Sequence, residues 1–206
     1  MIRSILLIAS ASVALSGCAL LASPDPVQLY RFGGASAFAG TGTTSACPDV
    51  HVSMRRVDFS EASRGDRILA VTGAEAAYIK GARWVSPAET LFEEALRNAF
   101  LDGGTCTVLS SGPLTRDGLL LSVDVRRFEA AYAAPGVVPD ANIVVLLRLI
   151  RPGDRSIVAE DRIAVSESAG ENRQSAIVAA FDRATAEASR QIVLWTDQQG
   201  FQATRN

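Results

Sequence analysis

The stretch Leu119–Ala133, LLLSVDVRRFEAAYA, decides the fold because it is a long strand whose apolar residues change face partway along. Its first apolar residues alternate with other residues and share one face, as a half-buried strand requires. These residues are Leu119, Leu121, Val123 and Val125. Phe128 and Tyr132 fall on the opposite face, and a β-bulge near Arg126 and Arg127 would return all six to the core side.

Further strands are predicted on both sides of this one. The two that follow, 142–151 and 156–166, are joined into a hairpin by the turn Pro152-Gly153-Asp154. Apolar patterning upstream predicts strands at 27–32, 49–59, 68–72, 76–85 and 105–110, with a turn around Gly81.

Two helices are expected. The first follows Ser86-Pro87-Ala88-Glu89, which has the pattern of a capping box with proline at the first helical position, and Gly103-Gly104 ends it. Its apolar stripe comprises Leu91, Phe92, Ala95, Leu96, Ala99 and Phe100, and Glu93 can pair with Arg97 on the exposed side. The second helix covers 172–197, with a buried stripe of Ile177, Phe181, Ala184, Ala188, Ile192 and Trp195.

Runs of strands with only two helices, and without βα alternation, predict an α+β fold. We expect a mostly antiparallel sheet of about six or seven strands with two amphipathic helices packed on it. The domain should cover 27–199, with a flexible Gly/Ala/Ser/Thr-rich loop at 33–46 and a tail at 200–206.

The N-terminus carries a lipoprotein signal. Arg3 precedes an apolar run of about eleven residues, too short to span a bilayer, and Leu15-Ser16-Gly17-Cys18 follows it. We therefore predict a signal peptide at 1–17, diacylglycerol and acyl chains such as palmitate on Cys18, and a lipidated tether at 18–26. An ordinary secretory signal that happens to contain a cysteine is the alternative.

Composition excludes several classes of protein. Removal of 1–17 leaves 189 residues, and loss of Arg3 from the 20 basic residues leaves 19 against 22 acidic ones. The chain has no long basic run, so we expect no nucleic-acid partner. After Cys18, no apolar segment approaches the length of a membrane span.

The sequence contains few residues in patterns typical of catalytic or metal sites. His51 is the single histidine, on the outer face of an alternating strand, and no G-x-S-x-G nucleophile elbow occurs. One histidine and two scattered cysteines do not make a zinc site. Glu93-Glu94 and Glu160-Asp161 are adjacent in sequence, so the members of each pair point apart. We therefore expect no catalytic residues, no metal and no cofactor besides the lipid on Cys18.

Cys47 and Cys106 remain after processing. An exported chain meets an oxidising compartment, so a disulfide between them is one hypothesis, and two separate buried thiols are the other.

The segment Tyr78–Val85 concentrates large aromatic and cationic residues. A turn-linked hairpin here could form a partner-binding surface, for which Tyr78 and Arg83 are the candidates. For Trp84 we favour a place in the core.

This segment, the amphipathic helix after it, the Phe128…Tyr132 strand and the pattern Ala180-Phe181-Asp182…Ala184 ending in Trp195 together resemble the ABC-type transport auxiliary lipoprotein family. The likeness covers roughly 29–195 and the lipobox. It implies a non-enzymatic envelope lipoprotein that docks an MCE-domain protein of a phospholipid transporter, and it leaves a homo-oligomer open.

Ala19 follows Cys18 where an aspartate commonly retains a lipoprotein in the inner membrane, so we expect the periplasmic side of the outer membrane. A periplasmic lipid-binding carrier is the alternative function. An envelope hydrolase is disfavoured because a nucleophile–base pair is missing.

Overall fold

The computed structural model describes residues 26–38, 49–110 and 118–205, which contain nine strands, two α-helices and the short 3₁₀ helix η2 (Glu61–Ser63). The strands are β1 (Gln28–Tyr30), β2 (Val50–Met54), β3 (Asp58–Phe59), β4 (Arg67–Thr72), β5 (Glu75–Trp84), β6 (Thr107–Leu109), β7 (Leu119–Tyr132), β8 (Asp140–Ile150) and β9 (Ile157–Ser168). The helices are α2 (Ala88–Gly103) and α3 (Gln174–Ala203).

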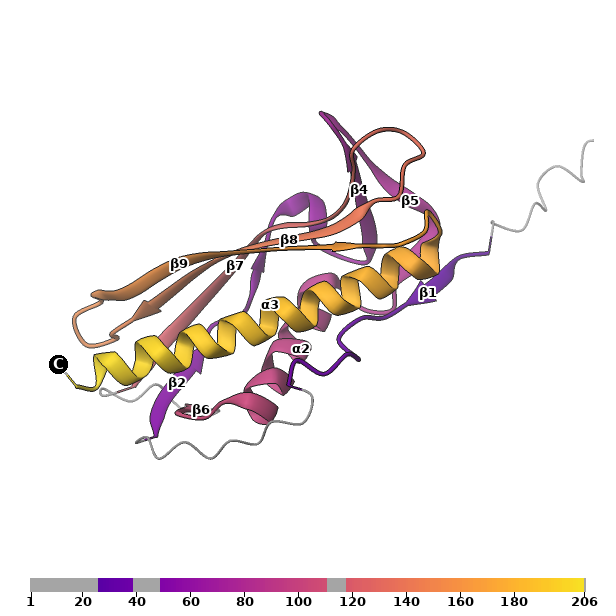
Figure 1. The fold of residues 1–206 in the computed structure, drawn as a ribbon. Coiled ribbons are helices and arrows are strands. Elements are labelled where there is room, and N and C mark those ends of the chain that lie inside the picture. The colour runs from indigo at the N-terminus through magenta and orange to yellow at the C-terminus, as the bar shows by residue number, and fades with distance from the viewer. Residues whose placement is uncertain (1–25, 39–48, 111–117, 206) are drawn as a thin grey trace, which may run out of the picture.

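Strand β7 organises the sheet (Figure 1). One of its edges pairs antiparallel with β8, which pairs antiparallel with β9. Its other edge carries β2, β3 and β4 in succession, all parallel to it. Strand β6 extends the sheet from β2, while β5 and then β1 extend it from β4.

The sheet therefore differs from the expectation of six or seven mostly antiparallel strands: nine strands are described, and the sheet is mixed. The physical reason is the length of β7, whose 14 residues give one edge room for three short parallel strands. The predicted strand 49–59 is two strands, because the extended pairing is interrupted between Met54 and Asp58. There the amide of Val57 donates to the Glu93 carboxylate of α2 at 3.3 Å.

The predicted β-bulge in β7 is confirmed. The register with β8 shifts between Val125 and Arg127, which leaves Arg126 as the extra residue. Val125 and Phe128 are consequently both buried on the helix-covered face, and Tyr132 is partly buried against the same core.

The predicted turn around Gly81 is wrong. Strand β5 continues from Glu75 to Trp84, and its register with β4 shifts between Arg67 and Leu69. Gly81 has φ +73°, which a glycine adopts without the Cβ clash of other residues, so the strand bends rather than turns back. Residues Tyr78–Trp84 are thus part of one irregular strand and do not form a hairpin, and Val85 follows the strand.

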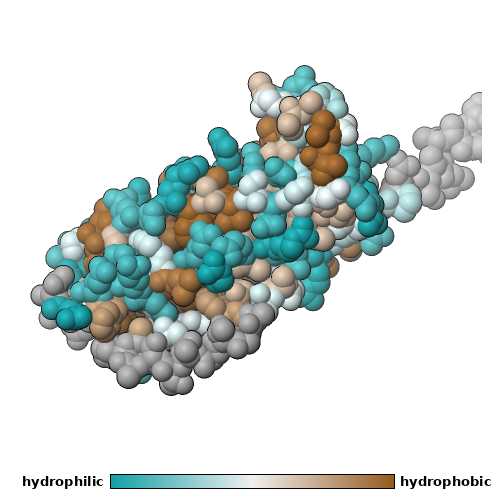
Figure 2. Space-filling model, in the orientation of Figure 1, coloured by the Kyte–Doolittle hydropathy of each residue, from teal (hydrophilic) through white to brown (hydrophobic). Residues whose placement is uncertain are grey.

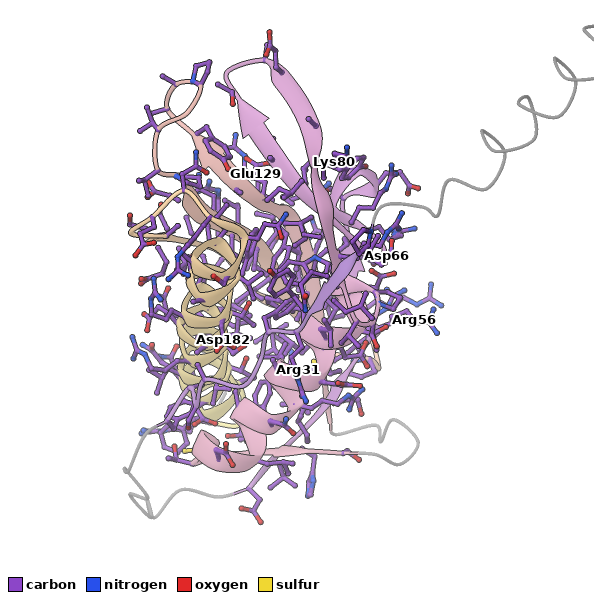
Figure 3. All side chains as sticks on the ribbon, turned by 90° about the vertical axis from the view of Figure 1, so that its right-hand side faces the viewer. Arg31, Arg56, Asp66, Lys80, Glu129 and Asp182 are labelled. Carbon is purple, nitrogen blue, oxygen red and sulfur yellow. The ribbon has the colours of Figure 1, made fainter. Side chains whose placement is uncertain are left out.

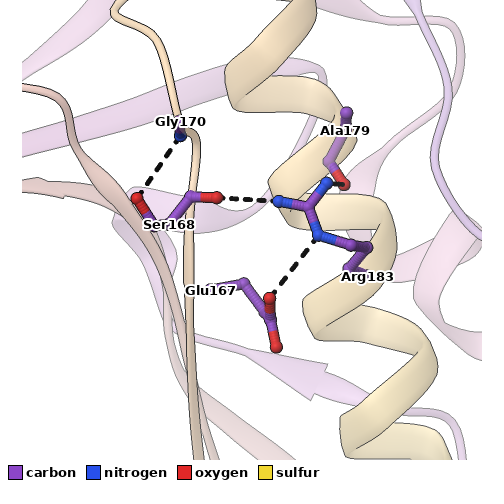
Figure 4. A network of polar contacts seen from close by, with 5 residues as sticks. All are labelled: Glu167, Ser168, Gly170, Ala179 and Arg183. Atoms are coloured by element: carbon purple, nitrogen blue, oxygen red, sulfur yellow. Dashed lines mark hydrogen bonds and ion pairs between the residues drawn. The ribbon is translucent and has the colours of Figure 1, made fainter.

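The two helices form a second layer on one face of the sheet. Helix α3 runs along β8 and β9, and α2 packs beside it (Figure 1). Arg183 of α3 fastens the helix to the end of β9, because its Nη2 donates to the Ser168 carbonyl at 2.7 Å and its Nε contacts Glu167 (Figure 4). Helix α3 ends at Ala203, six residues beyond the predicted end at Asp197.

The predicted capping box at the start of α2 does not form. Pro87 occupies the N-cap position, and no side chain caps the helix there. Glu89 instead contacts the segment between η2 and β4, where its Oε2 accepts a hydrogen bond from the Gly65 amide at 3.0 Å. The Glu93–Arg97 ion pair on the exposed side is confirmed at 2.9 Å.

Aromatic side chains fill the space between the sheet and the helices. Phe128 contacts five other rings, with centroid separations from 4.7 to 6.3 Å. These rings belong to Phe32, Phe59, Trp84, Phe92 and Phe181. The six rings come from the segment after β1, from β3, β5 and β7, and from both helices. The cluster is therefore the packing centre of the domain.

Candidate functional site

Strands β4 and β5 bring the two predicted partner-binding residues onto one surface. Arg83 is exposed between the buried residues Ala82 and Trp84, and it lies opposite Arg67 across the pair. Its Nη1 lies 2.9 Å from each carboxylate oxygen of Asp66. Both side chains of this ion pair are about half exposed, at 45% and 47%.

Tyr78 joins the same surface through Arg67. The Arg67 guanidinium carbon lies 3.7 Å above the centre of the Tyr78 ring, a cation–π contact. The Tyr78 hydroxyl donates to the carbonyl oxygen of Ala62 in η2 at 3.1 Å. We call Asp66, Arg67, Tyr78 and Arg83 the docking surface, after the partner-binding role predicted for Tyr78 and Arg83. Asp66 and Arg67 were not predicted from the sequence, because their approach to β5 depends on the irregular register between the two strands.

Trp84 belongs to the core, as favoured from the sequence. It is 2% exposed and contacts Phe32 and Phe181 edge-on. The segment therefore divides its side chains between two roles: Trp84 packs inward, while Tyr78 and Arg83 form a polar surface outside.

The other sequence candidates remain apart. His51 is exposed on β2, opposite Val108 of β6. Glu160 pairs with Arg148, and Asp161 accepts from the amide of its neighbour Arg162. In the described ranges, no cluster of three potential metal ligands occurs, and no helix is both long and apolar enough to cross a bilayer.

Asp182 of α3 binds the chain segment that follows β1. Its Oδ1 accepts hydrogen bonds from the amides of Gly33, Gly34 and Ala35 at 2.7, 2.9 and 3.2 Å. Gly33 has φ +86°, and a Cβ on it would lie 2.9 Å from the Cβ of Ala95 in α2. Residues 33–38 of the predicted loop are therefore attached to the helix layer, and 39–46 lie outside the described residues.

Asp197 plays a similar part at the other end of α3. Its buried carboxylate accepts hydrogen bonds from the amides of Thr105, Cys106 and Thr107 and from the Thr105 hydroxyl. This places Cys106 at the start of β6. Cys18 and Cys47 lie outside the described residues, so lipidation of the first and pairing of the second with Cys106 stay predictions.

Together these features define a class: an α+β domain whose mixed sheet is covered on one face by two helices and whose first strand continues from the predicted tether. The chain belongs to the family of ABC-type transport auxiliary lipoprotein components, whose family model matches residues 35–193. The resemblance inferred from the sequence is thus confirmed. No curated protein matches the chain.

Solved structures support the fold. A crystal structure of a protein from Xanthomonas campestris has a TM-score of 0.76 at 22% identity, covering 87% of this chain and 100% of that one. A crystal structure of an uncharacterised protein has a TM-score of 0.63 at 16% identity, covering 83% of this chain and 99% of the other. At these identities the likeness establishes the shared fold alone.

Proposed function

We propose that the protein is a non-enzymatic, lipid-anchored component of an ABC/MCE-type phospholipid transport system and that it docks the periplasmic assembly at the membrane. The family match over 35–193 carries this proposal, because an auxiliary transport component acts through partners. In this mechanism the permease and the ATPase supply the energy, while this chain holds the assembly at a lipid surface.

Anchoring rests on Cys18. Two or three acyl chains hold a protein stably on a membrane, whereas one chain binds only marginally. Cys18→Ser should therefore abolish signal processing and release the protein from the membrane fraction. Processing that is insensitive to globomycin, or wild-type membrane fractionation of the variant, would refute the anchor. Ala19 favours the outer membrane, and separation of the two membranes tests that location.

The docking surface is the place where we expect the MCE-domain protein to bind. Tyrosine and arginine are enriched at binding hot spots, and here both are held in place: Arg83 by Asp66, and Tyr78 by Arg67 and Ala62. Because the Arg83–Asp66 pair is half exposed, its loss should cost the fold no more than about 1 kcal/mol. Loss of binding can therefore be separated from loss of folding.

The experiment measures binding of the mature lipoprotein to its cognate MCE-domain protein in detergent. The double variant Tyr78→Ala, Arg83→Ala should weaken binding by at least tenfold without lowering the melting temperature appreciably. Arg148→Ala is the matched control, because Arg148 forms a similarly exposed ion pair with Glu160 on β8. Unchanged binding of the double variant, or equal weakening by Arg148→Ala, would rule out this surface.

A lipid-binding carrier receives less support. That function needs a wide apolar cavity between the sheet and the helices, whereas Phe128 and its five ring neighbours occupy this layer. A homo-oligomer was left open from the sequence, and the mass of the protein–detergent complex from light scattering would determine the oligomeric state.

A further inference from the structure

The two ends of the elongated domain differ in their distance from the predicted anchor. Residues 19–26 separate Cys18 from Val27, so fewer than ten residues link the acyl chains to the start of β1. A fully extended chain of that length spans about 28 Å, and a flexible one averages about 16 Å. Helix α3, with 30 residues, is about 45 Å long. The end at β1 must therefore stay near the lipid, while the opposite end can lie well away from it.

Large apolar side chains are exposed at the anchored end. Val27 and Leu29 flank Gln28 at the start of β1 and are 47% and 55% exposed. Val137 and Val138, in the connection between β7 and β8, are 46% and 38% exposed. Figure 2 shows brown, apolar residues on the part that projects from the molecule, at the end where Figure 1 labels β1. We call these four residues the anchor-end surface.

Hydrogen bonds through the start of α3 hold the two parts of this surface at one end. Gln174 accepts from the Tyr30 hydroxyl at 3.3 Å and donates to the Lys80 carbonyl at 2.8 Å. Two residues earlier, Asn172 donates to the Gly136 carbonyl at 3.4 Å and accepts from the Tyr132 hydroxyl at 3.1 Å. Strand β1 and the β7–β8 connection thus lie on either side of the same helix terminus.

We propose that the anchor-end surface rests on the lipid surface into which the acyl chains of Cys18 insert; this inference rests on the lipid anchor of the proposed function. A linker of this length gives the domain an effective concentration at the lipid surface in the millimolar range. A surface that binds lipid with a Kd of only about 1 mM would then be in contact for roughly half of the time. Four exposed aliphatic side chains suffice for such weak contact, since the acyl chains provide the main attachment.

Arg31, which lies beside these apolar residues in the chain, is also suited to a lipid surface. Arg31 follows Leu29 by two positions, so both side chains leave the same side of the extended chain, and Arg31 is exposed. Figure 3, viewed from this end, shows Arg31 on the segment that continues from β1. A guanidinium group pairs well with lipid phosphates while its stem lies along apolar surface. Leu29 is also in register with Arg83, so the docking surface adjoins the anchor-end surface and a docked assembly would meet the membrane.

The test uses the full mature lipoprotein in vesicles of phosphatidylethanolamine and phosphatidylglycerol containing brominated lipid, which quenches tryptophan emission at the bilayer. Leu29→Trp and Val137→Trp each add a reporter to the anchored end. Ile157→Trp is the matched control, because Ile157 is 52% exposed and lies at the β8–β9 hairpin, at the other end of the domain (Figure 1). Wild-type emission, from Trp84 and Trp195, is subtracted.

We expect bromine quenching of the added emission to be at least twofold stronger for Leu29→Trp and Val137→Trp than for Ile157→Trp. Equal quenching, or stronger quenching of Ile157→Trp, in protein that floats with the vesicles would overturn the proposed lipid contact of the anchor-end surface. The lipid anchor on Cys18 would still be supported. Protein that fails to float overturns both. A blue shift that depends on protein concentration and occurs without vesicles also overturns the proposal, because it identifies the surface as a contact between copies of the chain.

Discussion

The Oδ1 atom of Asp182 accepts a hydrogen bond from the amide of Gly33 at 2.7 Å, although the two residues are 149 positions apart in the chain. The same oxygen accepts from the next two amides, so three consecutive N–H groups converge on one carboxylate. The segment that leaves β1 is thereby attached to the long helix. A pull on the predicted N-terminal tether would reach the helix layer through this contact as well as through β1.

Removal of this carboxylate should loosen the start of the domain. We expect Asp182→Ala to lower the free energy of unfolding by about 1.5–3 kcal/mol, because hydrogen bonds to a charged group are lost and amides are left without an acceptor. Urea denaturation followed by tryptophan fluorescence measures the change. Asp161→Ala is the control: Asp161 is exposed and accepts from its neighbour Arg162, so its loss should cost less than about 0.5 kcal/mol. Similar losses in both variants would contradict the role of Asp182.

Gly33 provides a second test of the same contact. Gly33→Ala should cost more than Gly136→Ala, because both glycines have positive φ but only a Cβ at Gly33 would meet Ala95, at 2.9 Å. The left-handed backbone alone costs about 1–2 kcal/mol for alanine, and Gly136→Ala measures that part. The difference between the two variants in urea denaturation isolates the close approach of the segment to α2. Equal destabilisation would show that the segment moves away at little cost.

Phe181 should contribute far more to stability than Trp195, although both were predicted on the buried stripe of the last helix. Phe181 is fully buried and contacts Trp84 and Phe128, whereas Trp195 is only partly buried. We expect Phe181→Ala to cost about 3–5 kcal/mol through lost burial and a cavity, and Trp195→Ala to cost clearly less. Thermal unfolding with circular dichroism detection compares them. A smaller loss for Phe181→Ala would show that the aromatic cluster repacks.

Local patterns predicted the individual elements well. The change of face after Val125 in β7 required a bulge, since Val125 and Phe128 could not otherwise share the core. The spacing of Phe92, Leu96 and Phe100 placed one face of α2 correctly. Such features depend on alternation within one segment, which the sequence contains directly.

Long-range arrangements were not predictable in the same way. Nothing local indicates that β2, β3 and β4 would line one edge of β7 in parallel, because each pairing depends on where the intervening chain returns. The surface proposed for docking was predicted only in part for a related reason: Asp66 precedes β4 and reaches Arg83 beside an irregular register between β4 and β5. Asp182 belonged to the recognised helix pattern, yet its partner segment is far away in the chain.

The disulfide between Cys47 and Cys106 remains a prediction. Cys106 stands at the start of β6, fixed by Asp197, and a bridge to Cys47 would close a loop of about sixty residues. On the chain-entropy model such a bridge stabilises by about 4 kcal/mol. Mass spectrometry of envelope-extracted protein under non-reducing conditions should find the two cysteines linked, with Cα atoms within about 7 Å of each other in an experimental structure. Two free thiols would rule out the disulfide and support the alternative of two separate cysteines.

Stability should fall with acidification partly through Glu187. Hydrogen bonds from Arg190, and more weakly from Gln191, hold the pKa of the Glu187 carboxyl below its usual 4.5. A carboxyl with a lowered pKa in the folded state stabilises the fold above its unfolded-state pKa, and this contribution is lost as the pH falls through the folded-state value. Because Glu187 and Arg190 are 33% and 40% exposed, the contribution should not exceed about 1 kcal/mol.

The pH dependence of Glu187→Gln distinguishes this contribution from a simple loss of charge. Urea denaturation of wild type and variant should show a difference that is constant above the usual pKa of 4.5 and shrinks toward zero at lower pH, because protonated Glu187 resembles glutamine. Glu61→Gln removes another carboxylate that pairs with an arginine three residues on, but its side chain is 89% exposed, so it reports the effect of one charge alone. If the stability difference for Glu187→Gln stayed the same from neutral pH to well below 4.5, its ion pair with Arg190 would not be the cause.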